Sequence, residues 1–265
     1  MFKKIPIITC CEGGEEITSP FQFAEHAPGV FKNVDYIKNQ GIHRAYIIFY
    51  DNPENNEFLS KLNIVWEYHA GSTNTKVFEY KNALIAISCL GGPAAANLME
   101  ELRVFGIDEF IAIGTAGCLE DSIKDKIVIV DKAIRDEGLS YHYLKPSTYV
   151  HTNDCLNQEI VNYLTLKKLD FIKSTTWTTD AYYRETTRKI NMVKKLGAVA
   201  VEMECASWAA VAKYRKLKFS QMLYFSDIVK QEAWSRITKY TDGYESKNQD
   251  IVISIIKGMI DEYSK

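Results

Sequence analysis

Two glutamates separated by a single residue, Glu202 and Glu204, are the side chains of this sequence whose spacing most directly suggests chemistry. They lie at the end of the apolar run Ala198–Met203, just before a helical pattern that begins at Cys205. Such a run predicts a strand buried on both faces of a parallel sheet, and ligands bind at the carboxyl ends of such strands. Because a buried, unpaired carboxylate is costly, a sugar diol with two hydroxyl donors is one interpretation. Capping of the next helix, whose N-terminus attracts negative charge, is the alternative.

Polar and glycine residues also follow four other predicted strands, and we expect these segments to meet at one edge of the sheet. They are Cys89–Pro93, Ile113–Gly117, Trp177–Arg188 and Phe225–Asp227. The first is a glycine turn before a helix, which exposes backbone N–H groups that can hold an anion. The third combines aromatic faces with polar donors, as stacking and reading a nucleobase requires. An acid such as Asp227 could protonate a leaving base, although a helix or turn cap is equally consistent with its position.

Composition excludes several classes of protein. The chain has 265 residues, 46% hydrophobic and 25% charged, with a net charge of -2 and no run of five like charges. We therefore expect no nucleic-acid partner. No apolar stretch is long enough to cross a membrane, and Met1–Ile8 predicts a first strand and not a signal peptide. The six cysteines form no zinc-ligand pattern, so we expect no metal and a reduced, cytoplasmic protein.

Strand and helix patterns alternate along the whole chain without a linker. The predicted strands are Ile5–Thr9, Ala45–Tyr50, Leu84–Ser88, Phe110–Ile113, Ile127–Val130, Phe171–Trp177, Ala198–Met203 and Gln221–Phe225. The predicted helices are Ala94–Phe105, a second one capped by Asp154, Glu185–Leu196 and Lys247–Tyr263, the last with Ile251, Ile255, Met259 and Ile260 on one stripe. This order predicts an α/β fold with a mixed, mostly parallel sheet flanked by helices on both faces, in a single domain over residues 1–265.

Together these segments resemble the nucleoside phosphorylases of the uridine phosphorylase and hexameric purine nucleoside phosphorylase type. The similarity runs from about Leu90 to Ile228. Its motifs occur in the family's order: Gly91-Gly92-Pro93, Phe110–Gly117, Arg135–Tyr143, Thr179–Tyr183, Val201–Glu204 and Ser226-Asp227. Each fragment is short, but the correct order of all of them is specific. The resemblance implies a central twisted sheet and a homodimer or homohexamer.

Residue roles follow from the resemblance alone. It implies that Glu204 accepts hydrogen bonds from the ribose 2′- and 3′-hydroxyls, with Met203 packed under the sugar. Asp227 is similar to the acid that serves the purine ring nitrogen, whereas Arg188 lies near the base-reading arginine of pyrimidine-specific members, so the base stays open. The remaining substrate-binding positions implied are Gly114, Thr115, Tyr182, Glu202 and Ser226.

Two departures from the family concern phosphate. The N-terminal Gly-Asp-Pro-x-Arg loop is absent, and we place Cys10–Glu16 in its position; the arginine two residues before the Gly-Thr pair is Ala112. Arginine forks are the usual way to hold phosphate. The candidate replacements, from this subunit or a neighbouring one, are Gly92, Arg44, Arg135 and His142. The related nucleosidases use a carboxylate near the loop position to activate water, and Glu12 or Glu15 would be that group here.

The sequence therefore predicts an enzyme that cleaves the N-glycosidic bond of a small-molecule nucleoside. Phosphorolysis to a free base and a pentose 1-phosphate is the leading interpretation, with inorganic phosphate as co-substrate and no other cofactor. Hydrolysis of the same bond is the alternative, and a non-catalytic nucleoside-binding protein is a third. The sequence leaves the base, the sugar and the oligomeric state open.

Overall fold

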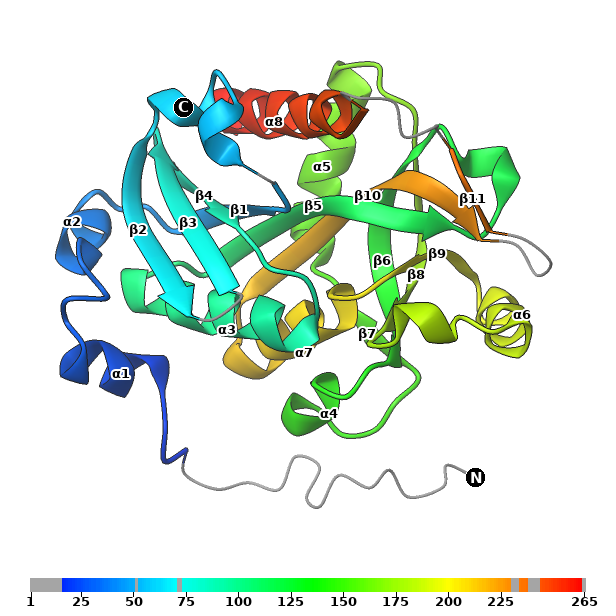
Figure 1. Cartoon of the computed structure of the whole chain (residues 1–265), viewed down its shortest axis with the longest axis horizontal. Helices are drawn as coiled ribbons and strands as arrows, with labels where there is room; N and C mark the ends of the chain where they lie inside the picture. Colours follow the sequence, from blue (N-terminus) through cyan, green and yellow to red (C-terminus); the bar gives the residue numbers. More distant parts are fainter. Residues whose placement is uncertain (1–15, 51, 71–72, 230–233, 238–243, 264–265) are drawn as a thin grey trace.

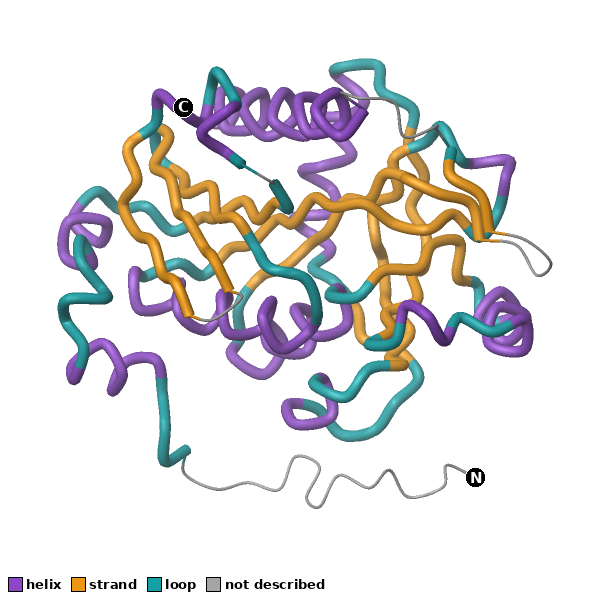
Figure 2. Tube along the Cα trace, in the orientation of Figure 1, coloured by secondary structure: helices purple, strands orange, loops and turns teal. Residues whose placement is uncertain are grey.

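The computed structural model describes residues 16–50, 52–70, 73–229, 234–237 and 244–263. Within these ranges the strands belong to one mixed sheet with helices on both of its faces (Figures 1 and 2). The strands are β1 (Arg44–Ile48), β2 (Asn63–Ala70), β3 (Thr73–Tyr80), β4 (Ala83–Ile87), β5 (Glu109–Cys118), β6 (Ile127–Asp136), β7 (Tyr149–His151), β8 (Phe171–Thr179), β9 (Ala198–Glu202), β10 (Lys218–Val229) and β11 (Trp234–Arg236). The α-helices are α1 (Pro20–His26), α2 (Val34–Asn39), α3 (Gly92–Leu102), α4 (Ser140–Tyr143), α5 (Asp154–Leu166), α6 (Thr187–Lys195), α7 (Cys205–Arg215) and α8 (Tyr244–Tyr263).

Strand β5 joins the two parts of this sheet. Its first half pairs in parallel with β1, its whole length pairs in parallel with β10, and its last residues pair with β9. The strands β5, β9, β8, β6 and β10 pair around a closed circuit, while β1, β4, β3 and β2 extend from it as an open sheet. Although β9 runs antiparallel to β5, Val201 pairs with Gly117, so the carboxyl ends of both strands meet. The carboxyl ends of β5 and β9 therefore meet as predicted, although the two strands are antiparallel and not parallel.

Two helical layers bury the sheet. Helices α3 and α7 cover one face, where Leu98 and Trp208 pack with Phe110 and Phe219 of the strands. Helices α5 and α8 cover the other, where Ile160 and Met259 belong to a second buried cluster with residues of the strands (Figure 1). The predicted stripe on the last helix is wrong at one position, because Ile251 is 57% exposed while Ile255, Met259 and Ile260 are buried.

Local capping chemistry sets the helix boundaries and corrects two predictions. Asn153, not Asp154, caps α5: its backbone is extended and its side chain accepts the N–H of Leu156 at 3.0 Å. The predicted helix Glu185–Leu196 begins only at Thr187, because the hydroxyl of Thr186 accepts the N–H of Lys189. Glu185 is left in the preceding loop, which proves important for the site.

The sheet also has strands that the prediction left out or made too short. The predicted strand Ile5–Thr9 lies outside the described residues, so β1 is the first described strand, and it lies between β4 and β5. The hairpin of β2 and β3 was not predicted. The predicted strand Gln221–Phe225 is the middle of a longer one, β10, so that Asp227 lies inside a strand and not just beyond it.

Candidate active site

The glycine turn after β4 and the acidic end of β9 are joined by a hydrogen bond. The backbone N–H of Gly91 donates to Oε1 of Glu204 at 2.6 Å. Gly91 is the N-cap of α3 with φ 96°, a left-handed conformation that favours glycine. The exposed N–H that could have held an anion at this helix N-terminus therefore already has a carboxylate partner.

The side chain of Glu202 accepts hydrogen bonds from backbone N–H groups. Its Oε2 accepts the N–H groups of Glu204 at 2.8 Å and of Cys205 at 2.7 Å, at the start of α7. Its Oε1 accepts the hydroxyl of Thr178. Glu202 therefore caps the next helix, α7, as the alternative interpretation proposed. The carboxylate of Glu204 points instead to the start of α3.

Glu204 is a buried acid beside another buried acid. It is 4% exposed, and burial together with the charge of Glu202 raises the pKa of its carboxyl well above the usual range. Loss of water is the larger cause and repulsion between the two carboxylates the second. Hydroxyl donors from a ligand would favour the charged form, so this carboxylate is suited to binding a diol.

Two further acids lie around the same helix ends. Asp180 accepts the N–H of Gly138 at 2.7 Å, and Glu137 accepts the hydroxyl of Ser207 at 3.0 Å. A Cβ at Gly92 would lie 2.4 Å from Oγ of Ser207, so α3 and α7 approach closely only because residue 92 is glycine. The sequence analysis did not select Glu137 as a site residue, although it falls inside the segment 135–143 that resembles the family.

Asp227 lies on β10 at an irregularity in the strand. Its pairing with β5 shifts register at Ser226, so that Asp227 comes opposite Gly117. A Cβ at Gly117 would lie 3.3 Å from Oδ2 of Asp227, and Ser226 donates to Oδ1 at 2.6 Å. Because Gly117 also pairs with Val201 of β9, Asp227 is two strand spacings, about 10 Å, from the end of β9.

Glu185 is an acid near Asp227 that sequence reasoning missed. Burial first, and the negative charge of Asp227 second, raise the pKa of Glu185 to about 7, while Lys189 opposes the shift. The residue lies in the loop that also carries Tyr182. Only its place inside the predicted base-reading segment could have pointed to it.

The other predicted substrate-binding residues differ in accessibility. Thr115 is exposed near the end of β5 and Met203 is partly buried beside Glu204. Tyr182 is 42% exposed and meets Tyr183 edge to face, while Arg188 is exposed on α6.

An aromatic ring covers Gly114. A Cβ at Gly114 would lie 3.1 Å from the ring of Phe49, which follows β1. The same ring packs against Trp208 of α7, with 6.0 Å between the ring centroids. The backbone where small residues were expected to admit a ligand is therefore lined by an apolar ring.

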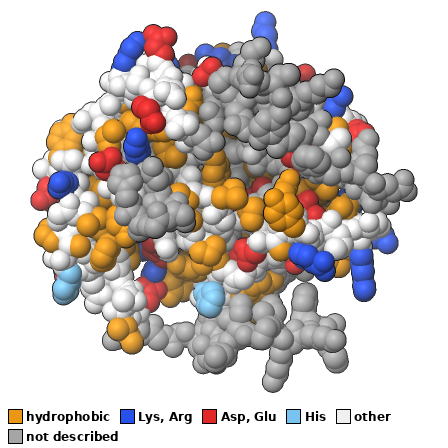
Figure 3. Space-filling model, viewed as in Figure 1, with side chains coloured by type: hydrophobic (Ala, Val, Ile, Leu, Met, Phe, Trp, Pro, Cys, Tyr) orange, Lys and Arg blue, Asp and Glu red, His pale blue; other side chains and the backbone are white. Residues whose placement is uncertain are grey.

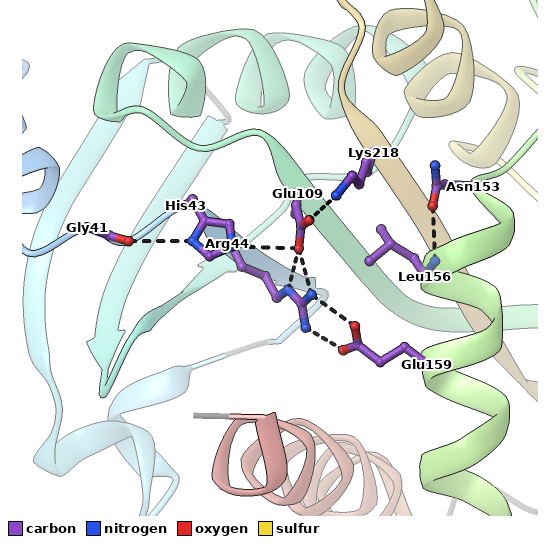
Figure 4. A network of polar contacts seen from close by, with 8 residues as sticks. All are labelled: Gly41, His43, Arg44, Glu109, Asn153, Leu156, Glu159 and Lys218. Carbon is purple, nitrogen blue, oxygen red and sulfur yellow. Dashed lines mark hydrogen bonds and ion pairs between the residues drawn. The ribbon is translucent and has the colours of Figure 1, made fainter. Parts of the chain in front are cut away.

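Arg44 lies at the other end of the sheet. It opens β1, whose residues run away from it toward the glycine turn. Its guanidinium donates to Glu109 of β5 and to Glu159 of α5, and Lys218 donates to Glu109 at 2.6 Å (Figure 4). Within this chain the structure does not bring Arg44 together with Glu204.

Arg135 is buried within its own loop. Its guanidinium donates to the hydroxyls of Ser140 and Ser147 at 2.8 Å and to the carbonyls of Leu144 and Lys145. These bonds hold the loop around α4, in which His142 is exposed. The two arginines proposed to hold phosphate are thus both engaged elsewhere.

The predictions on water activation, metal binding and membrane spans concern other parts of the chain. Glu12 and Glu15 lie outside the described residues. In the described part of the chain, no group of three or more His, Cys, Asp or Glu side chains could hold a metal ion, and no helix is long and apolar enough to cross a membrane. On the face shown in Figure 3, lysines and arginines are mixed with acidic and hydrophobic side chains.

The strand ends of this mixed sheet thus bring buried carboxylates to a glycine turn. The chain belongs to the phosphorylase superfamily, whose family model matches residues 46–257. The match begins at Tyr46, within β1, so Cys10–Glu16 lie outside it.

An uncharacterized protein and two nucleoside phosphorylases are similar to this chain in sequence. An uncharacterized protein of Acanthamoeba polyphaga mimivirus is 29% identical over 176 residues, 65% of this chain and 68% of that protein. A DeoD-type purine nucleoside phosphorylase of Buchnera aphidicola is 28% identical over 56% of this chain and 65% of its own length. A uridine phosphorylase of Thermococcus kodakarensis is 28% identical over 38% of each chain.

Solved structures share the fold at lower identity. Futalosine hydrolase of Helicobacter pylori superposes with a TM-score of 0.67 at 19% identity, over 84% of this chain and 99% of that one. A 5′-methylthioadenosine/S-adenosylhomocysteine nucleosidase from the same organism gives 0.66 at 20% identity, over 83% and 99%. The fold predicted from the sequence is confirmed.

Proposed function

We propose that this protein hydrolyses the N-glycosidic bond of a nucleoside, with water as the nucleophile. Membership of the phosphorylase superfamily supports cleavage of that bond. The observation that favours water is the hydrogen bond from Gly91 to Glu204, because a carboxylate takes an N–H at the start of α3 that could otherwise bind a phosphate.

The site residues suit an oxocarbenium-like transition state, in which positive charge develops on the sugar. Glu204 binds the sugar hydroxyls and, with Glu202 behind it, places negative charge near the developing cation. Tyr182 offers a ring face to the base. Asp227 passes a proton to the departing base nitrogen, as the bond between that nitrogen and the anomeric carbon breaks.

The two possible nucleophiles, phosphate and water, differ in charge. Phosphate carries between one and two negative charges at neutral pH, and a like charge about 8 Å away costs about 2 kcal/mol at an effective dielectric constant of 20. Glu137 and Asp180 add negative charge near the glycine turn, as does Glu204 once a diol favours its charged form, while Arg44 and Arg135 are bound elsewhere. Water avoids this cost because it is neutral.

Phosphorolysis is the second candidate, and the sequence relatives favour it. The named relatives with the higher identity, at 28%, are a purine nucleoside phosphorylase and a uridine phosphorylase. A phosphate site in this protein would need cations from outside the groups described above, such as those of a neighbouring subunit. On these grounds we place hydrolysis before phosphorolysis, the reverse of the order that the sequence suggested. The predicted homodimer or homohexamer and the cytoplasmic location stay predictions.

A nucleoside panel tests the proposal. Purine and pyrimidine nucleosides are incubated with the protein with and without inorganic phosphate, and the sugar product is identified. Release of free pentose in the absence of phosphate supports hydrolysis. Pentose 1-phosphate formed only with phosphate identifies a phosphorylase, and binding without turnover identifies a nucleoside-binding protein.

A further inference from the structure

Within the part of the chain that the structure describes, a buried amide on β10 has an oxygen without a hydrogen-bond partner. Gln221 of β10 is 1% exposed, yet its Oε1 accepts no hydrogen bond. An unsatisfied buried acceptor costs about 1–3 kcal/mol, so such groups are usually paired with protein or with ordered water. Asn157, a buried amide on α5, shows the usual arrangement: it donates to Thr152 at 2.9 Å and accepts from Ser220.

The head of Gln221 occupies space left free by a small residue. Gln221 pairs in parallel with Ala112 of β5, the position at which the resembling family carries an arginine. Its Nε2 lies 4.0 Å from the Cβ position of Gly114, the same position that the ring of Phe49 approaches to 3.1 Å. The amide therefore reaches two residues along β5, toward the carboxyl end of the strand.

This position connects to the sugar-binding acid through one turn of helix. Phe49 packs on Trp208, and the N–H of Trp208 donates to the carbonyl of Glu204 at 3.0 Å. The packed side chains of Phe49 and Trp208, together with one helical turn of about 5.4 Å, therefore connect the surroundings of Gly114, where the amide lies, to Glu204.

We propose that Gln221 holds the attacking water of the hydrolytic reaction. This rests on the proposed function and names a residue for its nucleophile. The water donates one O–H to Oε1 and directs a lone pair to the anomeric carbon. The C–O bond forms as the C–N electron pair leaves with the base nitrogen, which gains a proton through Asp227; the proton lost by the water returns to Asp227 or to solvent.

Substitution of Gln221 tests this directly. Gln221→Met conserves volume and removes the acceptor. We expect kcat for hydrolysis to fall by about 10- to 100-fold, as loss of nucleophile positioning does, with KM for the nucleoside within about twofold of the wild type. In added methanol, the ratio of methyl pentoside to free pentose should rise, because water loses its bound position. Unchanged kcat and partition ratio in a folded variant would overturn the proposal.

A matched control and a second measurement keep the outcome unambiguous. Asn157→Leu also removes a buried amide, but a fully paired one, so it should lower the melting temperature and leave the methanol partition unchanged. If Gln221→Met fails to fold, the wild type is crystallised with a nucleoside product. An ordered water within hydrogen-bond distance of Oε1 supports the proposal, and an empty or protein-filled position overturns it. Wild-type protein that releases pentose only as its 1-phosphate would instead refute the proposed function.

Discussion

The carboxylate of Glu204 and the backbone nitrogen of Gly91 lie 2.6 Å apart, although 113 positions separate them in the chain. The bond ties the end of β9 to the turn after β4 and orients one oxygen of the carboxylate. A sugar diol would meet an acid that is already fixed in place. Such preorganisation lets an electrostatic contact act in the transition state without further rearrangement.

Replacement of this acid measures its part in catalysis. Glu204→Gln keeps an oxygen that can accept the N–H of Gly91 but removes the charge. We expect kcat/KM to fall by about 100-fold, equivalent to about 2.7 kcal/mol. Steady-state kinetics on the best nucleoside of the panel provides the value. Near-normal activity in a folded variant would remove Glu204 from the mechanism.

The neighbouring acid should behave differently. Glu202→Ala removes the acceptor for the N–H groups of Glu204 and Cys205 at the start of α7. We expect a loss of about 1–2 kcal/mol in the free energy of unfolding, as for other helix caps. Urea unfolding measures it, and Glu204→Gln in the same assay is the comparison. Equal stability of Glu202→Ala and the wild type would contradict the capping role.

Asp227 should discriminate between classes of base. If it passes a proton to a departing purine, Asp227→Asn should lower kcat/KM for purine nucleosides far more than for pyrimidine nucleosides, whose ring offers no equivalent nitrogen. Parallel assays on one nucleoside of each class, with the same sugar, make the comparison. Equal losses on both would mean that Asp227 has a structural role.

Glu185 should produce a pH dependence of stability. Its pKa in the folded protein is raised to about 7 from an ordinary value of 4.5. Between these values the unfolded chain has released a proton that the folded protein retains, so the free energy of unfolding decreases as pH rises through this window. Glu185→Gln should abolish this contribution, so the difference in stability between variant and wild type changes between about pH 4.5 and pH 7. Parallel pH profiles would contradict it.

The fold was predictable from the sequence because its core elements are strongly patterned. The apolar run before Glu202 is a buried strand, and proline and glycine mark the start of α3. The edge hairpin β2–β3 was missed. Within β2, the alternation of apolar and polar residues at Trp66, Glu67 and Tyr68 was the signal.

The site residues were predictable only where the residue type and its position in the sequence together indicate a single role. Glu204 was selected from its place at a strand end, and Glu202 could not be distinguished from it until hydrogen bonds were assigned. Arg44 and Arg135 were selected for charge, but Arg44 is bound by carboxylates far along the chain, and Arg135 by hydroxyls and carbonyls of its own loop. Gln221 could not be found from the sequence, because an amide oxygen without a hydrogen-bond partner is a property of packing.

The most direct test of the account is the sugar product at saturating inorganic phosphate. The enzyme is supplied with its best nucleoside, with and without phosphate, and the sugar is identified by phosphorus NMR and by an assay for reducing sugar. The account predicts free pentose at the same rate under both conditions and no pentose 1-phosphate. Formation of pentose 1-phosphate at a rate that depends on phosphate would contradict it.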